Sequence, residues 1–151
     1  MIQETLANYE SVAQEKGLRL TAEVEPKLPE VDCDRDRILQ VLSNLVANAT
    51  KATPEGGHVT LRVETRGREF VFAVSDSGLG ISETDKKHLF ERYWRSGEAQ
   101  YKGTGLGLSI ARGIVSAHGG RIWAESEFGR GATFLFTIPA ADDGVVPAPQ
   151  A

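Results

Sequence analysis

Two asparagines and a lysine stand at helical spacing in the segment that follows Asp34. At about 100° per residue, Asn44, Asn48 and Lys51 fall on one polar stripe together with Gln40. An asparagine carbonyl is a neutral oxygen ligand suited to Mg²⁺, and a lysine ammonium is a point charge for phosphate. Asparagine also lowers helix propensity, because its amide competes with the backbone for hydrogen bonds. The two asparagines and the lysine are a candidate metal and phosphate site, and simple solvation or capping is the alternative.

An aspartate and two glycines follow an apolar run further along the chain. Residues 70–76 alternate as a strand, and Asp76 at its end leads into Gly78 and Gly80. A carboxylate at a strand end can accept a hydrogen bond from an exocyclic amine, and glycines let a ligand approach the backbone closely. An ordinary Asp-Ser-Gly turn is the alternative interpretation.

Three alternating glycines open a later helix. Gly103, Gly105 and Gly107 lie in the segment from Lys102 to Ile110. Free N–H groups and the positive end of a helix form an anion site. A helix start does not otherwise need glycines, because each lowers helix propensity by about 1 kcal/mol relative to alanine. The spacing matches neither a Walker A loop nor the dinucleotide fingerprint.

The elements that must position these groups follow from the periodicity. Apolar spacing predicts helices within residues 1–14, after Asp34 and from Leu106, with a short helical pattern near residues 87–94. Alternation predicts the strands, at residues 18–24, 58–64, 70–76, 121–126 and 132–138. This order predicts an α/β (α+β) two-layer sandwich with a mostly antiparallel mixed sheet and helices on one face. We expect residues 1–15 to end a linker or dimerisation helix, 16–140 to form the domain, and 141–151 to be a disordered tail.

Composition narrows the possible partners. The 151 residues carry a net charge of −4 and give a pI of about 5.4, unlike the basic footprint of nucleic-acid binders. No apolar run approaches the roughly 18 residues needed to cross a bilayer, and the N-terminus lacks the regions of a signal peptide. Cys33 is the single cysteine, which excludes an intramolecular disulfide. We expect a cytoplasmic domain without nucleic-acid or direct membrane contacts, whose parent protein could still be membrane-anchored.

Taken in order, these motifs resemble the ATP-binding domain of sensor histidine kinases. That family shares a superfamily with gyrase, the ninety-kilodalton heat-shock chaperones and the mismatch-repair ATPase MutL. The resemblance runs from about Leu18 to Pro139. Five segments carry it, namely residues 44–51 (N box), 76–80 (first glycine box), 89–95 (F box), 103–108 (second glycine box) and 129–134 (closing glycine turn).

The resemblance implies a Bergerat fold with ATP and Mg²⁺ as cofactors. Asn48 would ligate Mg²⁺ with support from Asn44, Lys51 and Arg95 would contact phosphates, and Asp76 would bind the adenine amino group. The implied catalytic residues are Asn44, Asn48, Lys51 and Arg95. The implied ATP contacts are Asn48, Lys51, Asp76, Gly78, Gly80, Ile81, Arg95, Lys102, Gly103, Thr104, Gly105, Leu106, Gly107, Leu108 and Thr133.

Two further features of the pattern concern the lid and the adenine. Residues 82–102 would form a mobile ATP lid over the bound nucleotide. The position after the N-box lysine, often tyrosine in the family, is Ala52. Some adenine packing would therefore be lost or supplied by another residue.

Chemistry separates the branches of this superfamily. The ATPases and the anti-sigma serine kinases carry a glutamate four residues before the metal-binding asparagine, where this chain has Asn44, which cannot take a proton. Transfer to histidine needs no such base, because neutral imidazole is already nucleophilic. We therefore expect γ-phosphoryl transfer from ATP to a histidine. A non-catalytic ATP-binding switch and an anti-sigma-type serine kinase are the alternatives.

The acceptor histidine is expected outside this chain. His58, His88 and His118 do not lie in the helical His-Glu/Asp context of an acceptor. The implied partners are the histidine-bearing dimerisation domain of the same kinase and a downstream response regulator. The isolated domain would be monomeric, because dimerisation would belong to the missing helical hairpin.

Overall fold

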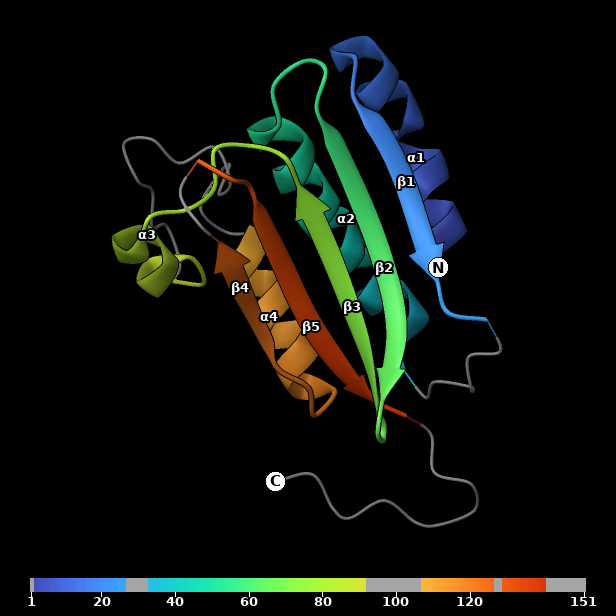
Figure 1. Cartoon of the computed structure of the whole chain (residues 1–151). Coiled ribbons are helices and arrows are strands. Elements are labelled where there is room, and N and C mark those ends of the chain that lie inside the picture. The colour runs from blue at the N-terminus through green and yellow to red at the C-terminus, as the bar shows by residue number, and fades with distance from the viewer. Residues whose placement is uncertain (1, 27–32, 92–106, 127–128, 141–151) are drawn as a thin grey trace.

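The computed structural model describes residues 2–26, 33–91, 107–126 and 129–140 (Figure 1). The helices in this part of the chain are α1 (Ile2–Lys16), α2 (Arg35–Ala52), α3 (Glu83–His88) and α4 (Gly107–Ala117). The strands are β1 (Arg19–Val24), β2 (His58–Arg66), β3 (Glu69–Asp76), β4 (Ile122–Ser126) and β5 (Ala132–Pro139). Every strand predicted from alternation is present, and the predicted helices after Asp34 and from Leu106 correspond to α2 and α4.

The five strands form one mixed sheet in the order β1-β2-β3-β5-β4. Strand β1 pairs parallel to β2, and the other three pairings are antiparallel. Helices α1, α2 and α4 cover one face, whereas α3 lies apart from the sheet on the β4 side (Figure 1). The predicted two-layer α/β fold is therefore confirmed.

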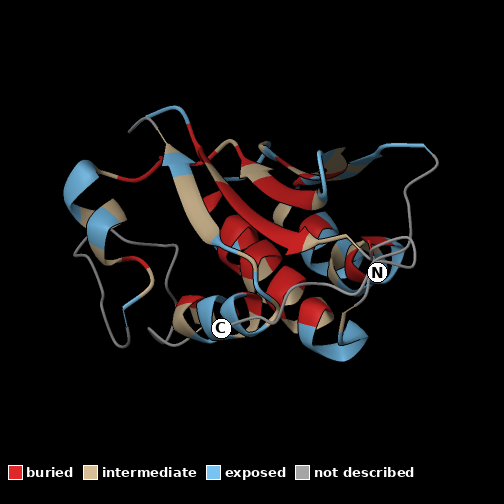
Figure 2. Ribbon diagram, turned by 90° about the horizontal axis from the view of Figure 1, so that it is seen from below, coloured by how far each residue is buried: buried red, intermediate tan, exposed pale blue. Residues whose placement is uncertain are grey.

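The core lies between the sheet and the helix layer (Figure 2). Alternate residues of β5, Phe134, Phe136 and Ile138, are fully buried there, as the two-residue period of a strand requires. The rings of Phe72 and Phe136 stack with centroids 4.6 Å apart. The helix side is supplied by an apolar face of α2, which comprises Ile38, Val41, Leu42, Leu45, Val46 and Ala49.

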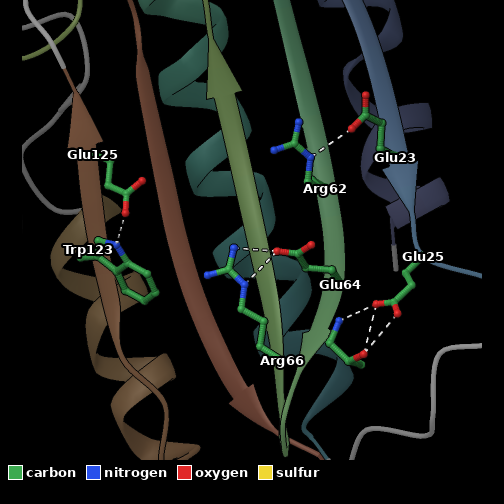
Figure 3. Close-up of polar contacts among 8 residues, drawn as sticks. Glu23, Glu25, Arg62, Glu64, Arg66, Trp123 and Glu125 are labelled. Atoms are coloured by element: carbon green, nitrogen blue, oxygen red, sulfur yellow. Dashed lines mark hydrogen bonds and ion pairs between the residues drawn. The ribbon is translucent and has the colours of Figure 1, made fainter.

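The face of the sheet away from the helices is more polar (Figure 3). Arg62 pairs with Glu23 at 3.0 Å across the β1–β2 ladder, and Arg66 pairs with Glu64 at 2.8 Å. A small apolar cluster of Val71, Ala73 and Leu135 lies on the same face against Trp123. The helix layer therefore covers only one of the two faces, which leaves polar side chains on the other.

Local capping sets where two helices begin. The side chain of Asp34 accepts a hydrogen bond from Arg37 N at 3.3 Å, so Asp34 is the N-cap of α2. Ser82 caps α3 in the same way, and the helix starts at Glu83 because of this cap. The short helix predicted near residues 87–94 therefore begins earlier and ends at His88; residues 92–94 lie outside the described residues.

Helix α1 packs against α2 and β1 of the same domain. Tyr9 Oη donates to Ser43 O at 3.1 Å, and Lys16 Nζ donates to Lys51 O at 3.0 Å. Arg35 of α2 forms an ion pair with Glu4. Helix α1 thus joins the packing of the domain. That it ends a dimerisation helix stays a prediction, and the proposed tail of residues 141–151 lies outside the described residues. None of the helices described could cross a bilayer by length and hydropathy.

Candidate nucleotide-binding site

The amide stripe of α2 lies where the predicted helical spacing puts it. Asn48 is buried, Asn44 is half-buried, and Lys51 is exposed near the end of the helix. Asn44 Nδ2 donates to the carbonyl oxygen of Gly107, the first residue of α4, at 3.0 Å. The stripe therefore runs from the contact with α4 toward the C-terminal end of α2.

Asp76 ends β3 as a buried carboxylate, with 7% of its surface exposed. Its Oδ1 atom accepts hydrogen bonds from Gly78 N at 2.9 Å and from Ala132 N at 3.3 Å. Hydrogen bonds from backbone N–H groups to a carboxylate are among the stronger ones in proteins. The carboxylate is thus fixed in orientation between the first glycine box and the start of β5.

Two glycines allow the backbone around Asp76 to pack closely. A Cβ atom on Gly78 would lie 2.5 Å from Ala52 O, and one on Gly131 would lie 2.2 Å from Asp76 O. Gly131 also has a φ of 88°, which L side chains rarely adopt. The end of α2, the first glycine box and the closing glycine turn therefore meet at distances that only glycine permits.

Ser126 links the segment that follows the first glycine box to the closing glycine turn. It is not among the site residues predicted from the sequence. Its hydroxyl accepts from Ile81 N at 2.7 Å and donates to Gly131 O at 2.9 Å. Ile81, predicted to contact ATP, is buried in the core cluster. The available signal was a hydroxyl residue at the end of a strand that leads into a glycine turn.

The structure does not bring Thr133 to this group. Thr133 pairs with Ser75 across the β3–β5 ladder, and their hydroxyl oxygens lie 2.9 Å apart. Side chains alternate along a strand, so Thr133 shares with Leu135 the face opposite the core residue Phe134. The neighbour of Asp76 is instead Ala132, through its backbone N–H.

The second glycine box is only partly within the described residues. Gly107 begins α4, and Leu108 is fully buried, so any contact of Leu108 with a nucleotide would come from its backbone. Of the F box, Leu89 is buried and Phe90 contacts Phe134 edge-on at 6.5 Å. The predicted site residues outside the described part of the chain are Arg95, Lys102, Gly103, Thr104, Gly105 and Leu106.

Helix α2 therefore connects the two halves of the candidate site. Asn44 contacts the start of α4, and Ala52, two turns later, contacts the turn that follows Asp76. At about 1.5 Å per residue these positions are about 12 Å apart along the helix. Asn48 therefore lies on α2 midway between the contact with the start of α4 and the contact with the turn that follows Asp76.

The sequence that forms this site matches a known protein family. A family model described as histidine kinase-, DNA gyrase B-, and HSP90-like ATPase matches residues 33–142. The chain belongs to this family. The matched range includes α2, Asp76 and both glycine boxes, so the fold is that of an ATP-binding domain.

Two similar proteins are sensor kinases. The chain is 44% identical over 118 residues to the sensor histidine kinase WalK of Bacillus subtilis (strain 168), covering 75% of this chain and 19% of WalK. It is 46% identical over 128 residues to the adaptive-response sensory kinase SasA of Synechococcus sp. (strain JA-2-3B'a(2-13)), covering 83% of this chain and 34% of SasA. The chain thus spans about a fifth of the length of WalK and about a third of the length of SasA.

Solved structures in the family agree with the fold. The catalytic domain of the histidine kinase ThkA superposes with a TM-score of 0.82 at 36% identity, covering 92% of this chain and 90% of that one. ThkA in complex with the response regulator protein TrrA gives a TM-score of 0.78 at 33% identity, covering 93% of this chain and 39% of that one. The predicted resemblance to histidine kinase ATP-binding domains is confirmed.

Proposed function

We propose that this chain is the catalytic domain of a two-component sensor histidine kinase and transfers the γ-phosphoryl group of ATP to a histidine on another domain. The observation that carries the proposal is the buried Asp76 carboxylate, which two backbone N–H groups orient beside the end of an amide-bearing helix. An oriented carboxylate acceptor suits the exocyclic amine of adenine and disfavours the carbonyl that guanine has in its place.

Mg²⁺ fits the donor set on α2. Mg²⁺ usually binds one or two protein oxygens and keeps phosphate oxygens and water as its other ligands. The amide of Asn48 is buried within the helix stripe and supplies a neutral oxygen. Asn48 would hold the ion, which would neutralise phosphate charge during transfer. Lys51 and Arg95 would contact the phosphates, and the second glycine box would surround them.

The environment of Asn44 favours a kinase over an ATPase. An ATPase must activate water with a general base, and a side-chain amide has no basic atom. Its Nδ2 atom already donates to Gly107 O. Phosphoryl transfer to a neutral imidazole depends mainly on positioning and charge neutralisation, which the stripe and the glycine turns can provide.

Two of the three histidines, His118 and His88, support an acceptor on a separate domain. His118 uses both ring nitrogens, since Nε2 accepts from Asp34 N at 3.0 Å and Nδ1 lies 2.9 Å from Ile114 O. His88 Nδ1 lies 3.0 Å from Glu91 Oε2. Both rings are thus engaged within the domain. The ThkA–TrrA complex supports a response regulator as the downstream partner.

The test uses this chain with a separately produced histidine-bearing helical hairpin and ATP labelled at the γ-phosphate. We expect Mg²⁺-dependent label on the hairpin that is lost in acid, because phosphohistidine is acid-labile and phosphoserine is not. Acid-stable label would instead support a serine kinase. ATP binding without transfer to the hairpins of several kinases would support a non-catalytic switch and contradict the proposal.

A further inference from the structure

Asn44 links two elements that the proposed site needs. Its Nδ2 atom donates to Gly107 O at 3.0 Å, a hydrogen bond between residues 63 positions apart in the chain. That carbonyl also belongs to the first turn of α4, where it accepts from the N–H four residues later. A Cβ atom on Gly107 would lie at an ordinary van der Waals distance, 3.9 Å, from Asn44 Cγ, so the two helices lie close together here.

A second link ties the other end of α4 to the same helix. His118, just past the last residue of α4, accepts a hydrogen bond from Asp34 N through Nε2. Its other ring nitrogen, Nδ1, lies 2.9 Å from Ile114 O within α4. Asp34 precedes α2 and Asn44 lies in its middle, so α4 runs antiparallel to α2 and is held at both ends.

The two spacings match along the helix axes. Asp34 and Asn44 are about 15 Å apart at 1.5 Å per residue, and Gly107 and His118 are about 16 Å apart. Between the two links, Leu108, Ala111 and Val115 of α4 are fully buried. Apolar packing can tolerate a small slide of one helix along another, whereas two directional hydrogen bonds at matched spacing select one position.

We propose that Asn44 is a positioning residue that fixes the first turn of α4 relative to Asn48, rather than a ligand of the metal. The inference rests on the proposed function, in which the N-terminal end of α4 receives phosphate and Asn48 faces the metal. Asn48 lies one turn beyond Asn44 on the same face of α2. The hydrogen bond to Gly107 therefore sets the distance between the two groups that hold the triphosphate.

The binding test compares ATP with and without Mg²⁺, using calorimetry on the whole chain. Loss of one hydrogen bond of this kind corresponds to about a fivefold weaker affinity. We expect Asn44→Ala to weaken ATP binding about fivefold both with Mg²⁺ and with a chelator, and to leave AMP affinity within about twofold. If ATP affinity falls only in the presence of Mg²⁺, Asn44 is a metal ligand. If AMP affinity falls as much as ATP affinity, the variant has a general structural defect. Either result overturns the proposal.

Gln40→Ala is the matched control. Gln40 lies one turn earlier on the same stripe, and its Oε1 accepts from Arg37 of the same helix at 3.5 Å. This residue does not bridge α2 to α4 through that bond. We expect its ATP affinity to equal that of the wild type, and a loss as large as that of Asn44→Ala would remove the case for a specific link.

Amide hydrogen exchange tests the link without any nucleotide. In Asn44→Ala we expect the amides of the first two turns of α4 to exchange at least about fivefold faster, with the strand amides unchanged. Asn44→Asp keeps the shape of the side chain and removes the donor, so it serves if the alanine variant folds poorly. Unchanged exchange in α4 would overturn the link, whereas failure of the wild type to bind ATP would overturn only the proposed function.

Discussion

The backbone carbonyl oxygen of Ala52 lies 2.5 Å from the place that a Cβ atom would take on Gly78. Ala52 is the last residue of α2, and Gly78 follows Asp76 by two residues. The close approach brings the end of the amide-bearing helix against the turn that orients the carboxylate. The spacing between the two halves of the site therefore depends on the absence of a side chain at one position.

Gly78→Ala should damage both the fold and the site. The added methyl group would overlap Ala52 O, and such overpacking typically costs about 1–3 kcal/mol of unfolding free energy. Urea denaturation and ATP titration would measure the two effects. Gly113→Ala is the control, because Gly113 is an exposed position of α4 and its Cβ atom would meet nothing within 4 Å. We expect it to stabilise the domain by about 0.5–1 kcal/mol. Equal stability of the two variants would contradict the packing argument.

Asp76→Asn should reduce discrimination between ATP and GTP. The amide oxygen can still accept from Gly78 N and Ala132 N, so the turn should keep its geometry. The charge that strengthens a hydrogen bond from adenine is lost, which corresponds to roughly a tenfold or larger change in affinity. Competitive titration with the two nucleotides measures the ratio. An unchanged ratio would show that Asp76 does not contact the base.

Asn48→Ala should remove the Mg²⁺ dependence of ATP binding. The buried amide oxygen is the group expected to hold the ion, so the affinities with Mg²⁺ and with a chelator should become equal within about twofold. Asn44→Ala provides the contrast, since it should weaken both affinities and preserve their ratio. Calorimetry under the two conditions distinguishes the asparagines. Mg²⁺ dependence that survives in Asn48→Ala would place the metal elsewhere.

Substitutions of Thr133 and Ala132 should differ in their effect on ATP affinity. Thr133→Ala alters the sheet face away from the helices, where the hydroxyl contacts Ser75, so ATP affinity should stay within about twofold. Ala132→Val adds volume at a buried position beside Asp76 and should weaken ATP binding about tenfold or more. The same titration measures both variants. A larger loss for Thr133→Ala would reverse the assignment of the two residues.

Much of this arrangement could be predicted, because its parts are local in sequence. Helical spacing places Asn44, Asn48 and Lys51 on one stripe, and alternation places Asp76 at a strand end. The faces of β5 were also open to prediction, since Phe134, Phe136 and Ile138 alternate as core residues and leave Thr133 on the other side.

The remaining features depend on contacts between distant segments. Ser126 meets Ile81 across 45 positions, and Asn44 meets Gly107 across 63. The sheet order places β5 between β3 and β4, which the order of the strands along the chain does not specify. Tyr9 and Lys16 show in the same way that α1 packs on α2. The sequence pattern within one segment cannot predict these contacts, because they are selected by the packing of the whole core.

The parallel pairing of β1 with β2 has a consequence for the order of folding. Strands β2 and β3 form an antiparallel hairpin joined by a short turn at Gly67, so they can pair early from contacts close in sequence. Arg19 pairs with His58 only after the intervening helix α2 has crossed back over the sheet. We therefore expect β1, with α1 attached, to join the domain last during refolding and to separate from it first under tension. Force that reaches the domain through α1 would act on the strand whose pairing forms latest.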